Sequence, residues 1–264
     1  MDITSLGYRT DLALLEAAGS ELTDRGTYVV VRTPANPTFW WGNFLLFGTP
    51  FTSESVEPRL ELFRTEFPTA EHVAIGIDSV DGAVGAEEGL AAAGLEIDRS
   101  TVMTASRVLE PKRPNEWAEY RFLTSDDDWE QLVGLTLAAS SLEEIDAGYE
   151  EFNRRRVLAA RELVESGRAK WFGAFEGEQL QASLGLAPDG QGAARFQTVQ
   201  THPDARGLGL ASTLVHRASR YGFDELGVET LVMVADPEYL AIRLYRALGF
   251  TDTETQLQVA KPPA

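Results

Sequence analysis

Two segments in different halves of this chain repeat one order of sequence features. Residues 91–106 read AAAGLEIDRSTVMTAS, and residues 246–261 read RALGFTDTETQLQVAK. Each segment starts as the end of a helical pattern, passes through a glycine and an apolar residue, and then alternates like a β-strand up to a small residue. Because a recurring order of elements marks a repeated structural unit, we infer an internal duplication.

The length of the chain agrees with two related halves. Its 264 residues are too many for one typical domain and suit two, since a domain usually has about 100–200 residues. Two prolines and charges of both signs lie within residues 111–116, as is common in linkers. We predict a first domain at 1–110, a linker at 111–116 and a second domain at 117–264.

The second domain shows helix and strand patterns in alternation. Its first strand is expected at 117–124, and carboxylates open the helix at 125–140, where they favour the positive end of the helix dipole. The other expected elements are a helix at 147–166, β-rich runs at 169–177, 178–188 and 193–201, a helix that ends near 223, a strand at 229–236, a helix at 237–249 and a strand at 250–260. Pro237 stands where a first helical residue can be proline, and Gly249 where a carboxy-terminal cap favours glycine. The fold class is therefore α/β, with a mixed sheet.

The first 110 residues repeat the later part of that order. The expected elements are strands at 27–34 and 39–48, a helix at 53–67, a strand at 71–79, a helix at 86–95 and a strand at 96–106.

Composition narrows the classes of function. The chain has no cysteine, which removes thiolate metal sites, and no pair of His72, His202 and His216 has a metal-ligand spacing. The formal net charge of −18 argues against nucleic acid as a partner, because binding phosphates needs a basic face. The same charge can attract a cationic, amine-bearing small substrate, or it can reflect only a soluble acidic surface.

The sequence shows no membrane-spanning or secretory segment. No apolar run reaches the ~20 residues of a membrane span, and the amino-terminal segment carries an acid at position 2 where a signal peptide has basic residues. We expect a cytoplasmic protein that has no membrane partner.

A strand-like run leads into a helix-like run through residues 201–215, THPDARGLGLASTLV. The first amides of a helix have no partner within the helix and lie at the positive end of its dipole, so they can bind an anion. Gly207 and Gly209 lack Cβ atoms, which lets a phosphate approach the backbone and permits left-handed dihedrals in the turn, and Arg206 adds a cation. A plain glycine turn stays an alternative, since short glycine patterns occur by chance. The dinucleotide fingerprint does not fit, because G-x-G-x-A replaces G-x-G-x-x-G and lies near the end of the chain.

Two blocks together resemble the acyl-CoA-dependent N-acetyltransferases of the GNAT superfamily. The family's signature is Arg or Gln, two arbitrary residues, Gly, one arbitrary residue, and Gly or Ala. Its positions are matched by Arg206, Gly207, Leu208, Gly209, Leu210 and Ala211. The second block, AIRLYRALGF at 241–250, resembles the family's last helix and its Gly-Phe exit. The resemblance covers roughly residues 117–260. It implies two tandem GNAT-like domains, each a mostly antiparallel twisted sheet flanked by helices.

The resemblance implies acetyl-CoA as the cosubstrate and no metal. The backbone of Val199, Gln200 and Thr201 would pair with the pantetheine arm like an added strand, and the amides from Arg206 to Ala211 would bind the pyrophosphate. Tyr245 matches the tyrosine that protonates the departing thiolate, and a phenol with a pKa of ~10 carries its proton at neutral pH. A purely structural role in the core is the alternative for Tyr245.

The sequence departs from the family's pattern in two places. Glu238 stands where the family often has an asparagine, and residues 193–201 hold no carboxylate that could act as the general base. An amine must lose a proton to attack, so some proton acceptor is expected. The acid-rich segment 141–151 is where the family builds its acceptor pocket, although a solvated acidic loop is the alternative there. Its candidate carboxylates are Glu143, Glu144, Asp146 and Glu150.

The first half resembles a degenerate copy of the same fold. In the alignment of the two repeats, Leu90 lies opposite Tyr245, and Glu54 and Glu57 would repel a phosphate at the start of their helix. We expect this half to lack the cofactor, to cover the acceptor pocket and to take the place of a second subunit, which favours a monomer.

The leading hypothesis is an enzyme that transfers an acetyl group from acetyl-CoA to a primary amine of a small molecule or peptide. Direct attack is expected, because no cysteine nucleophile is present and no Ser-His-acid set stands out. The alternative is a catalytically silent acyl-CoA-binding sensor or ligand-binding module, which Glu238 and the missing strand carboxylate leave open.

Overall fold

The structure of the protein is a computed structural model that describes residues 1–140 and 145–262. Contacts divide the chain into two units. The first unit consists of Met1–Met103, Val234–Tyr239 and Asp252–Ala264, and the second of Thr104–Met233 and Leu240–Thr251.

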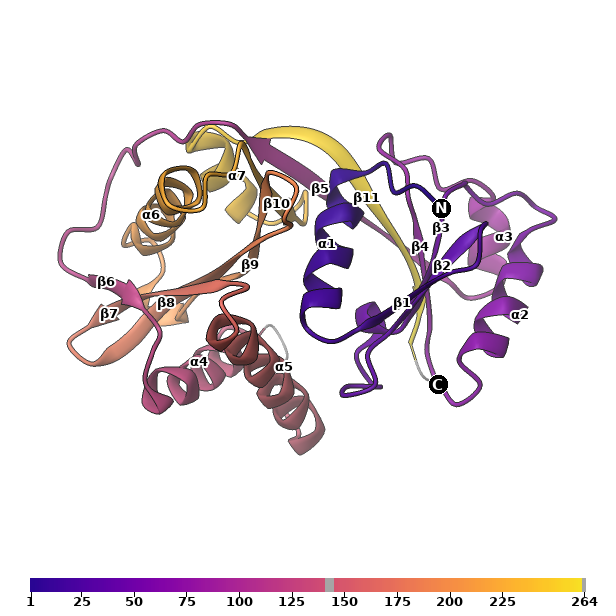
Figure 1. Ribbon diagram of the computed structural model, residues 1–264, viewed down its shortest axis with the longest axis horizontal. Coiled ribbons are helices and arrows are strands. Elements are labelled where there is room, and N and C mark those ends of the chain that lie inside the picture. Colours follow the sequence, from indigo (N-terminus) through magenta and orange to yellow (C-terminus); the bar gives the residue numbers. More distant parts are fainter. Residues whose placement is uncertain (141–144, 263–264) are drawn as a thin grey trace. The chain divides into compact units, whose positions relative to one another are not determined.

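The first unit is a sheet with helices on both faces. Its elements are α1 (Leu6–Ala17), β1 (Glu21–Asp24), β2 (Tyr28–Arg32), a 3-10 helix (Trp40–Gly42), β3 (Phe44–Phe47), α2 (Val56–Glu66), β4 (Val73–Ile77), α3 (Glu87–Ala92), β5 (Glu96–Ala105) and most of β11 (Thr251–Lys261). The strand order is β1-β2-β3-β4-β11-β5. Only β3 and β4 pair in parallel among the registered pairs of this unit. Figure 1 shows α1 on one face of the sheet and α2 and α3 on the other.

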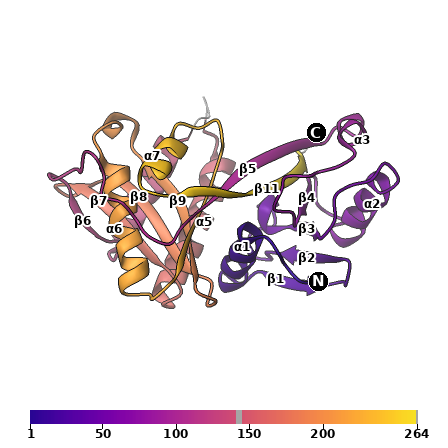
Figure 2. The same cartoon turned by 90° about the horizontal axis from the view of Figure 1, so that it is seen from above.

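Strand β11 completes the core of the first unit. Leu257 and Val259 are fully buried, and the hydroxyl of Tyr8 in α1 donates a hydrogen bond to the Leu257 carbonyl. The register sets Val259 opposite Ile75 of β4, and Figure 2 shows the two strands side by side. The sequence predicted the strand itself but placed it in the second domain. Alternation of apolar and polar residues shows that a segment is a strand. Which strand it pairs with depends on packing between residues far apart in the chain. The linker boundary at 111–116 stays a prediction.

The second unit is a sheet in the order β6-β7-β8-β9-β10. Its elements are β6 (Glu119–Phe122), α4 (Asp126–Ala138), α5 (Ala147–Glu165), β7 (Lys170–Glu176), β8 (Gln179–Pro188), β9 (Ala193–Thr201), a 3-10 helix (Pro203–Ala205), α6 (Leu210–Asp224), the greater part of β10 (Thr230–Ala235) and α7 (Ala241–Ala247). Strands β6 to β9 pair antiparallel, and β9 and β10 pair in parallel. Helices α4 and α5 cover one face, and α6 and α7 lie on the other (Figures 1 and 2).

The two units repeat the same elements, as the sequence predicts. Each contains a parallel strand pair joined through a helix, β3-α2-β4 in the first unit and β9-α6-β10 in the second. Helices α3 and α7 also end alike. The Leu95 amide donates to Leu90 at 3.0 Å and the Phe250 amide to Tyr245 at 3.1 Å, each around a glycine with positive φ, as in a Schellman cap. The predicted α/β class, with mostly antiparallel sheets flanked by helices, is confirmed.

Local details differ from the sequence prediction at three places. Helix α7 begins at Ala241 and not at Pro237, because the Asp236 carboxylate accepts the Glu238 amide at 2.8 Å and closes a separate turn first. The predicted strand at 39–48 is a strand only from Phe44, after a 3-10 turn. The short strand β1 was not predicted at all.

None of the helices within the described ranges combines the length and the apolar character that crossing a bilayer requires.

The amino end of α4 is stabilised by an ion pair between the buried Asp128 and the half-buried Arg121. Both carboxylate oxygens of Asp128 accept from Arg121 at 2.7 and 2.8 Å, and Asp128 also accepts the Thr124 and Ser125 amides. These donors, the guanidinium first, lower the pKa of Asp128. Because the folded pKa lies below the unfolded value of ~3.9, the stabilisation is complete above about pH 5 and is lost as the pH falls towards the folded pKa.

We expect Asp128→Asn to lower the free energy of unfolding by about 2 kcal/mol at pH 7, because charge-assisted hydrogen bonds are lost. The difference from wild type should shrink steadily between pH 5 and pH 2. Urea unfolding followed by circular dichroism across that range measures it. A difference that does not change with pH would contradict the assignment to the carboxylate charge.

Candidate functional site

Strand β9 separates from β10 partway along its length. The registered pairs are Ala193 with Thr230, Ala194 with Leu231 and Arg195 with Val232, and the pairing ends there. Beyond this point a bulge bends β9, since Leu184 of β8 lies opposite both Thr198 and Val199, and Thr198 has a φ of 46°. Within the described part of the chain, the edge of β9 that faces β10 is therefore left without a strand partner over Val199 to Thr201. An extended ligand can pair with such an edge.

In the turn after β9, some backbone amides donate hydrogen bonds within the protein and others do not. The Ala205 amide donates to His202 at 2.9 Å and the Arg206 amide to Pro203 at 3.3 Å. The next bond of this kind joins the Thr213 amide to the Gly209 carbonyl at 3.1 Å. Between them, the amides of residues 207–212 donate to no described residue. Since α6 starts at Leu210, these amides lie at the positive end of its dipole.

The two glycines of the turn have different surroundings. Both have positive φ, 76° for Gly207 and 79° for Gly209. A Cβ atom on Gly207 would meet nothing within 4 Å, whereas one on Gly209 would lie 2.6 Å from the carbonyl oxygen of Arg113. The sequence predicts left-handed dihedrals for both glycines, which the structure has, and close approach of a phosphate, which stays a prediction. The structure shows in addition that Gly209 allows close approach of the linker, a contact between distant residues that no local pattern could reveal.

Tyr245 is buried, with 5% of its surface exposed. Its ring lies edge-on to Phe250 at 6.4 Å, and Phe250 lies edge-on to Phe196 of β9 at 5.9 Å. This row of rings joins α7 to the bulged strand, so Tyr245 packs in the core of the same unit that carries the turn. A catalytic role for its hydroxyl stays a prediction.

The carboxylates proposed for the acceptor pocket divide into two groups. Glu143 and Glu144 lie outside the described residues. Asp146 caps α5 by accepting the Tyr149 amide at 2.7 Å, and Glu150 pairs with Arg154 at 3.0 Å. Both described carboxylates therefore have structural partners.

The face of β9 that is turned to α4 is polar and uncharged near the bulge. Gln200 donates from Nε2 to the Thr136 hydroxyl at 3.0 Å, and Thr136 donates to the Leu132 carbonyl at 2.8 Å. Ser183, opposite Gln200 in the register, is fully buried. Sequence reasoning did not identify Thr136 or Ser183, because the contact of Thr136 with Gln200 depends on how α4 packs on the sheet and that of Ser183 on the register of β8 and β9.

The counterpart turn in the first unit is closed by an arginine. Arg59 of α2 donates to the Thr49 carbonyl and hydroxyl at 2.9 Å and to the Pro50 carbonyl at 3.0 Å. Its guanidinium lies 4.3 Å from the Phe47 ring centroid and 4.6 Å from that of Phe51. In the same turn the Phe51 amide donates to the Val84 carbonyl at 2.7 Å and the Thr52 amide to the Ser55 hydroxyl at 2.8 Å, so these amides have partners within the protein, unlike those of residues 207–212.

No group of three or more metal-binding side chains occurs in the parts of the chain that the structure describes.

Comparison with known proteins agrees with this geometry. Residues 113–250 match the acetyltransferase (GNAT) family. The search of curated proteins found no match.

Three solved structures share the fold. A functionally unknown conserved protein from Staphylococcus epidermidis ATCC 12228 has a TM-score of 0.73 at 12% identity, over 94% of this chain and 96% of that one. A GCN5-related N-acetyltransferase from Kribbella flavida has a TM-score of 0.68 at 18% identity, over 99% and 97%. A tandem GNAT protein from the clavulanic acid biosynthesis pathway has a TM-score of 0.55 at 14% identity, over 96% and 88%. At these identities the likeness concerns the fold alone.

Proposed function

Because the chain belongs to the GNAT acetyltransferase family, we propose that it transfers an acetyl group from acetyl-CoA to a primary amine by direct attack. One observation carries the proposal: the unpaired edge of β9 leads directly into the turn whose amides at 207–212 are open. In acetyl-CoA an extended pantetheine arm leads into a pyrophosphate, so the arm matches the unpaired edge of β9 and the pyrophosphate matches the turn.

The chain's own residues supply the cofactor contacts in this proposal. The backbone of Val199, Gln200 and Thr201 pairs with the pantetheine amides, as a strand would. The amides of residues 207–212 bind the pyrophosphate, and the exposed Arg206 side chain adds a positive charge. The Arg206 amide contributes little, since it already donates to Pro203.

The proposed reaction needs one nucleophile and one acid. The amine nitrogen attacks the acetyl carbonyl carbon, the carbon–sulfur bond breaks, and Tyr245 gives its phenolic proton to the thiolate. The amine passes its own proton to water, because β9 carries no carboxylate. A small amine-bearing acceptor, attracted by the net charge of −18, is the proposed partner, and nucleic acid is not.

The first unit has no cofactor role in this proposal. The Phe51 and Thr52 amides of the counterpart turn already donate to Val84 and Ser55, and Glu57 places a negative charge in the first turn of α2. One acetyl-CoA per chain is therefore expected.

A silent acyl-CoA sensor is the second candidate. The lack of a carboxylate on β9 and the presence of Glu238 favour it. An assay of thiol release from acetyl-CoA over a broad panel of amines separates the two. Binding of acetyl-CoA without turnover of any amine would support the sensor.

Tyr245→Phe is expected to lower kcat by about 100-fold, because proton transfer from a positioned acid contributes at least about that factor. The KM for acetyl-CoA should stay within a factor of about two, since the ring still packs on Phe250. Steady-state kinetics with the best amine of the panel measures both constants. An unchanged kcat would leave Tyr245 with only its packing role.

A further inference from the structure

The segment before β6 passes directly behind the open turn, and Asn115 is its point of attachment. Asn115 is 5% exposed, although it lies in a proline-containing connection. Its side-chain nitrogen donates to the Leu208 carbonyl at 2.9 Å, and its side-chain oxygen accepts the Ala118 amide at 3.0 Å. Its own amide donates to the Thr213 hydroxyl of α6 at 2.8 Å. The side-chain nitrogen thus holds the turn to the connection, the side-chain oxygen orders the connection itself, and the backbone amide attaches the connection to α6.

The bond to Leu208 fixes the direction of the next amide. In a trans peptide the carbonyl and the N–H point in opposite directions, and no cis peptide occurs in the described chain. Holding the Leu208 carbonyl towards Asn115 therefore turns the Gly209 N–H away from the connection. The Gly209 amide is one of the amides of residues 207–212 that donate to no described residue.

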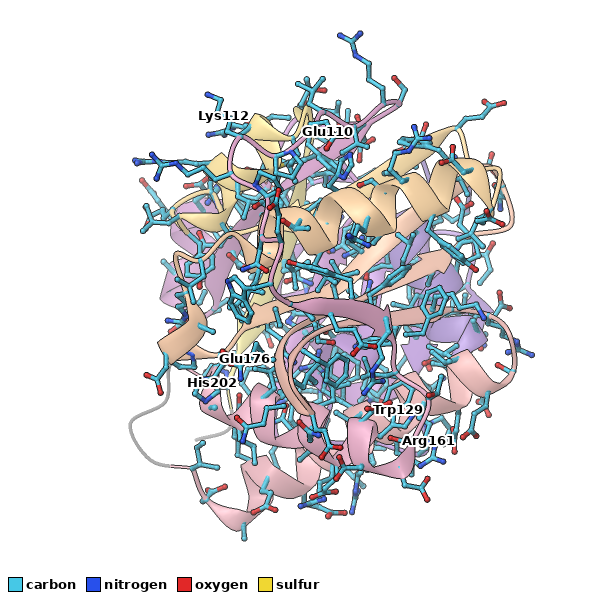
Figure 3. The ribbon with its side chains drawn as sticks, turned by 90° about the vertical axis from the view of Figure 1, so that its left-hand side faces the viewer. Glu110, Lys112, Trp129, Arg161, Glu176 and His202 are labelled. Atoms are coloured by element: carbon cyan, nitrogen blue, oxygen red, sulfur yellow. The ribbon has the colours of Figure 1, made fainter. Side chains whose placement is uncertain are left out.

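A second contact supports the same arrangement, since the Arg113 carbonyl oxygen lies 2.6 Å from the position that a Cβ atom of Gly209 would take. A cavity of about 410 Å³ lies between the connection and α6, lined by residues that include Pro111, Pro114, Asn115 and Thr213. Figure 3 shows Glu110 and Lys112 on this part of the segment. The turn is thus held from behind at Arg113 and Asn115.

We propose that Asn115 is a positioning residue of the cofactor site, which orients the Gly209 amide towards the pyrophosphate. This inference rests on the proposed function only for the identity of the ligand. It extends the site beyond the residues of the glycine turn to a segment about 90 positions earlier in the chain.

The test compares Asn115→Asp and Asn115→Ala with Glu116→Gln. Both Asn115 variants lose the donor to Leu208, and Asn115→Ala does so without adding charge. Glu116→Gln exchanges a carboxylate for an amide at the neighbouring exposed position, with the Leu208 bond intact. Calorimetric titration with acetyl-CoA should give a Kd about tenfold higher for both Asn115 variants and unchanged for Glu116→Gln. The kcat at saturating acetyl-CoA should stay within about twofold of wild type, which loss of folded protein would not produce.

A second measurement does not depend on the cofactor. Trypsin can cut after the exposed Arg206, and a turn released from Asn115 opens more often. Without ligand, cleavage at this bond should be about fivefold faster in both Asn115 variants, with no change in Glu116→Gln.

The outcomes separate the two proposals. Wild-type Kd and cleavage rate in folded Asn115→Ala would overturn the positioning role, and so would an effect confined to Asn115→Asp, because added charge would then explain it. If wild type does not bind acetyl-CoA, the proposed function fails, and the cleavage rates still decide the role of Asn115.

Discussion

Leu257→Asp will unfold the first unit. Leu257 is fully buried in the core of that unit, and its strand pairs with β4. An aspartate there would place a carboxylate without a partner among apolar side chains. We expect the free energy of unfolding to fall by more than about 4 kcal/mol, which exceeds most single substitutions. Urea unfolding, followed by circular dichroism and tryptophan fluorescence, measures the change.

Leu257→Met is the matched control, because it conserves volume and polarity and should cost less than about 1.5 kcal/mol. A chain that ends after residue 251 should show the same loss of the first unit as Leu257→Asp. Wild-type stability of Leu257→Asp would mean that β11 does not belong to this core.

Gly209→Ala will destabilise the turn far more than Gly207→Ala. Both substitutions put an alanine at positive φ, which costs about 1–2 kcal/mol. At Gly209 the new Cβ atom would also lie 2.6 Å from the Arg113 carbonyl, so the connection must move. We expect a loss of about 3 kcal/mol in the free energy of unfolding for Gly209→Ala and about 1 kcal/mol for Gly207→Ala.

The same pair of variants should differ in binding. Moving Arg113 also moves Asn115 away from Leu208, so the thermal shift induced by acetyl-CoA should disappear in Gly209→Ala. Gly207→Ala should retain a reduced shift, because nothing in the protein opposes its methyl group. Differential scanning fluorimetry with and without acetyl-CoA measures both effects. Equal losses in the two variants would contradict the distinction between the glycines.

Local sequence patterns predicted much of the second unit. The strand, turn and helix around Gly207 and Gly209 were found because alternation, glycine and helical spacing each depend on residues close in the chain. The duplication was visible for the same reason, since the helix ends at Gly94 and Gly249 repeat one local motif. The start of α7 was predicted four residues too early, because the Glu238 amide donates to the Asp236 carboxylate in a separate turn before the helix begins.

The sequence by itself determined most of the segments that form strands and helices, and that a turn suited to an anion precedes α6. Tertiary structure alone decided that β11 pairs with β4, that β9 leaves β10 after Arg195, and that Asn115 holds Leu208. Periodicity is encoded over a few neighbouring residues, whereas these choices depend on which distant surfaces pack together. The sequence therefore predicts a turn with open amides. The direction of the Gly209 N–H depends on the segment before β6, which only the folded chain brings next to the turn.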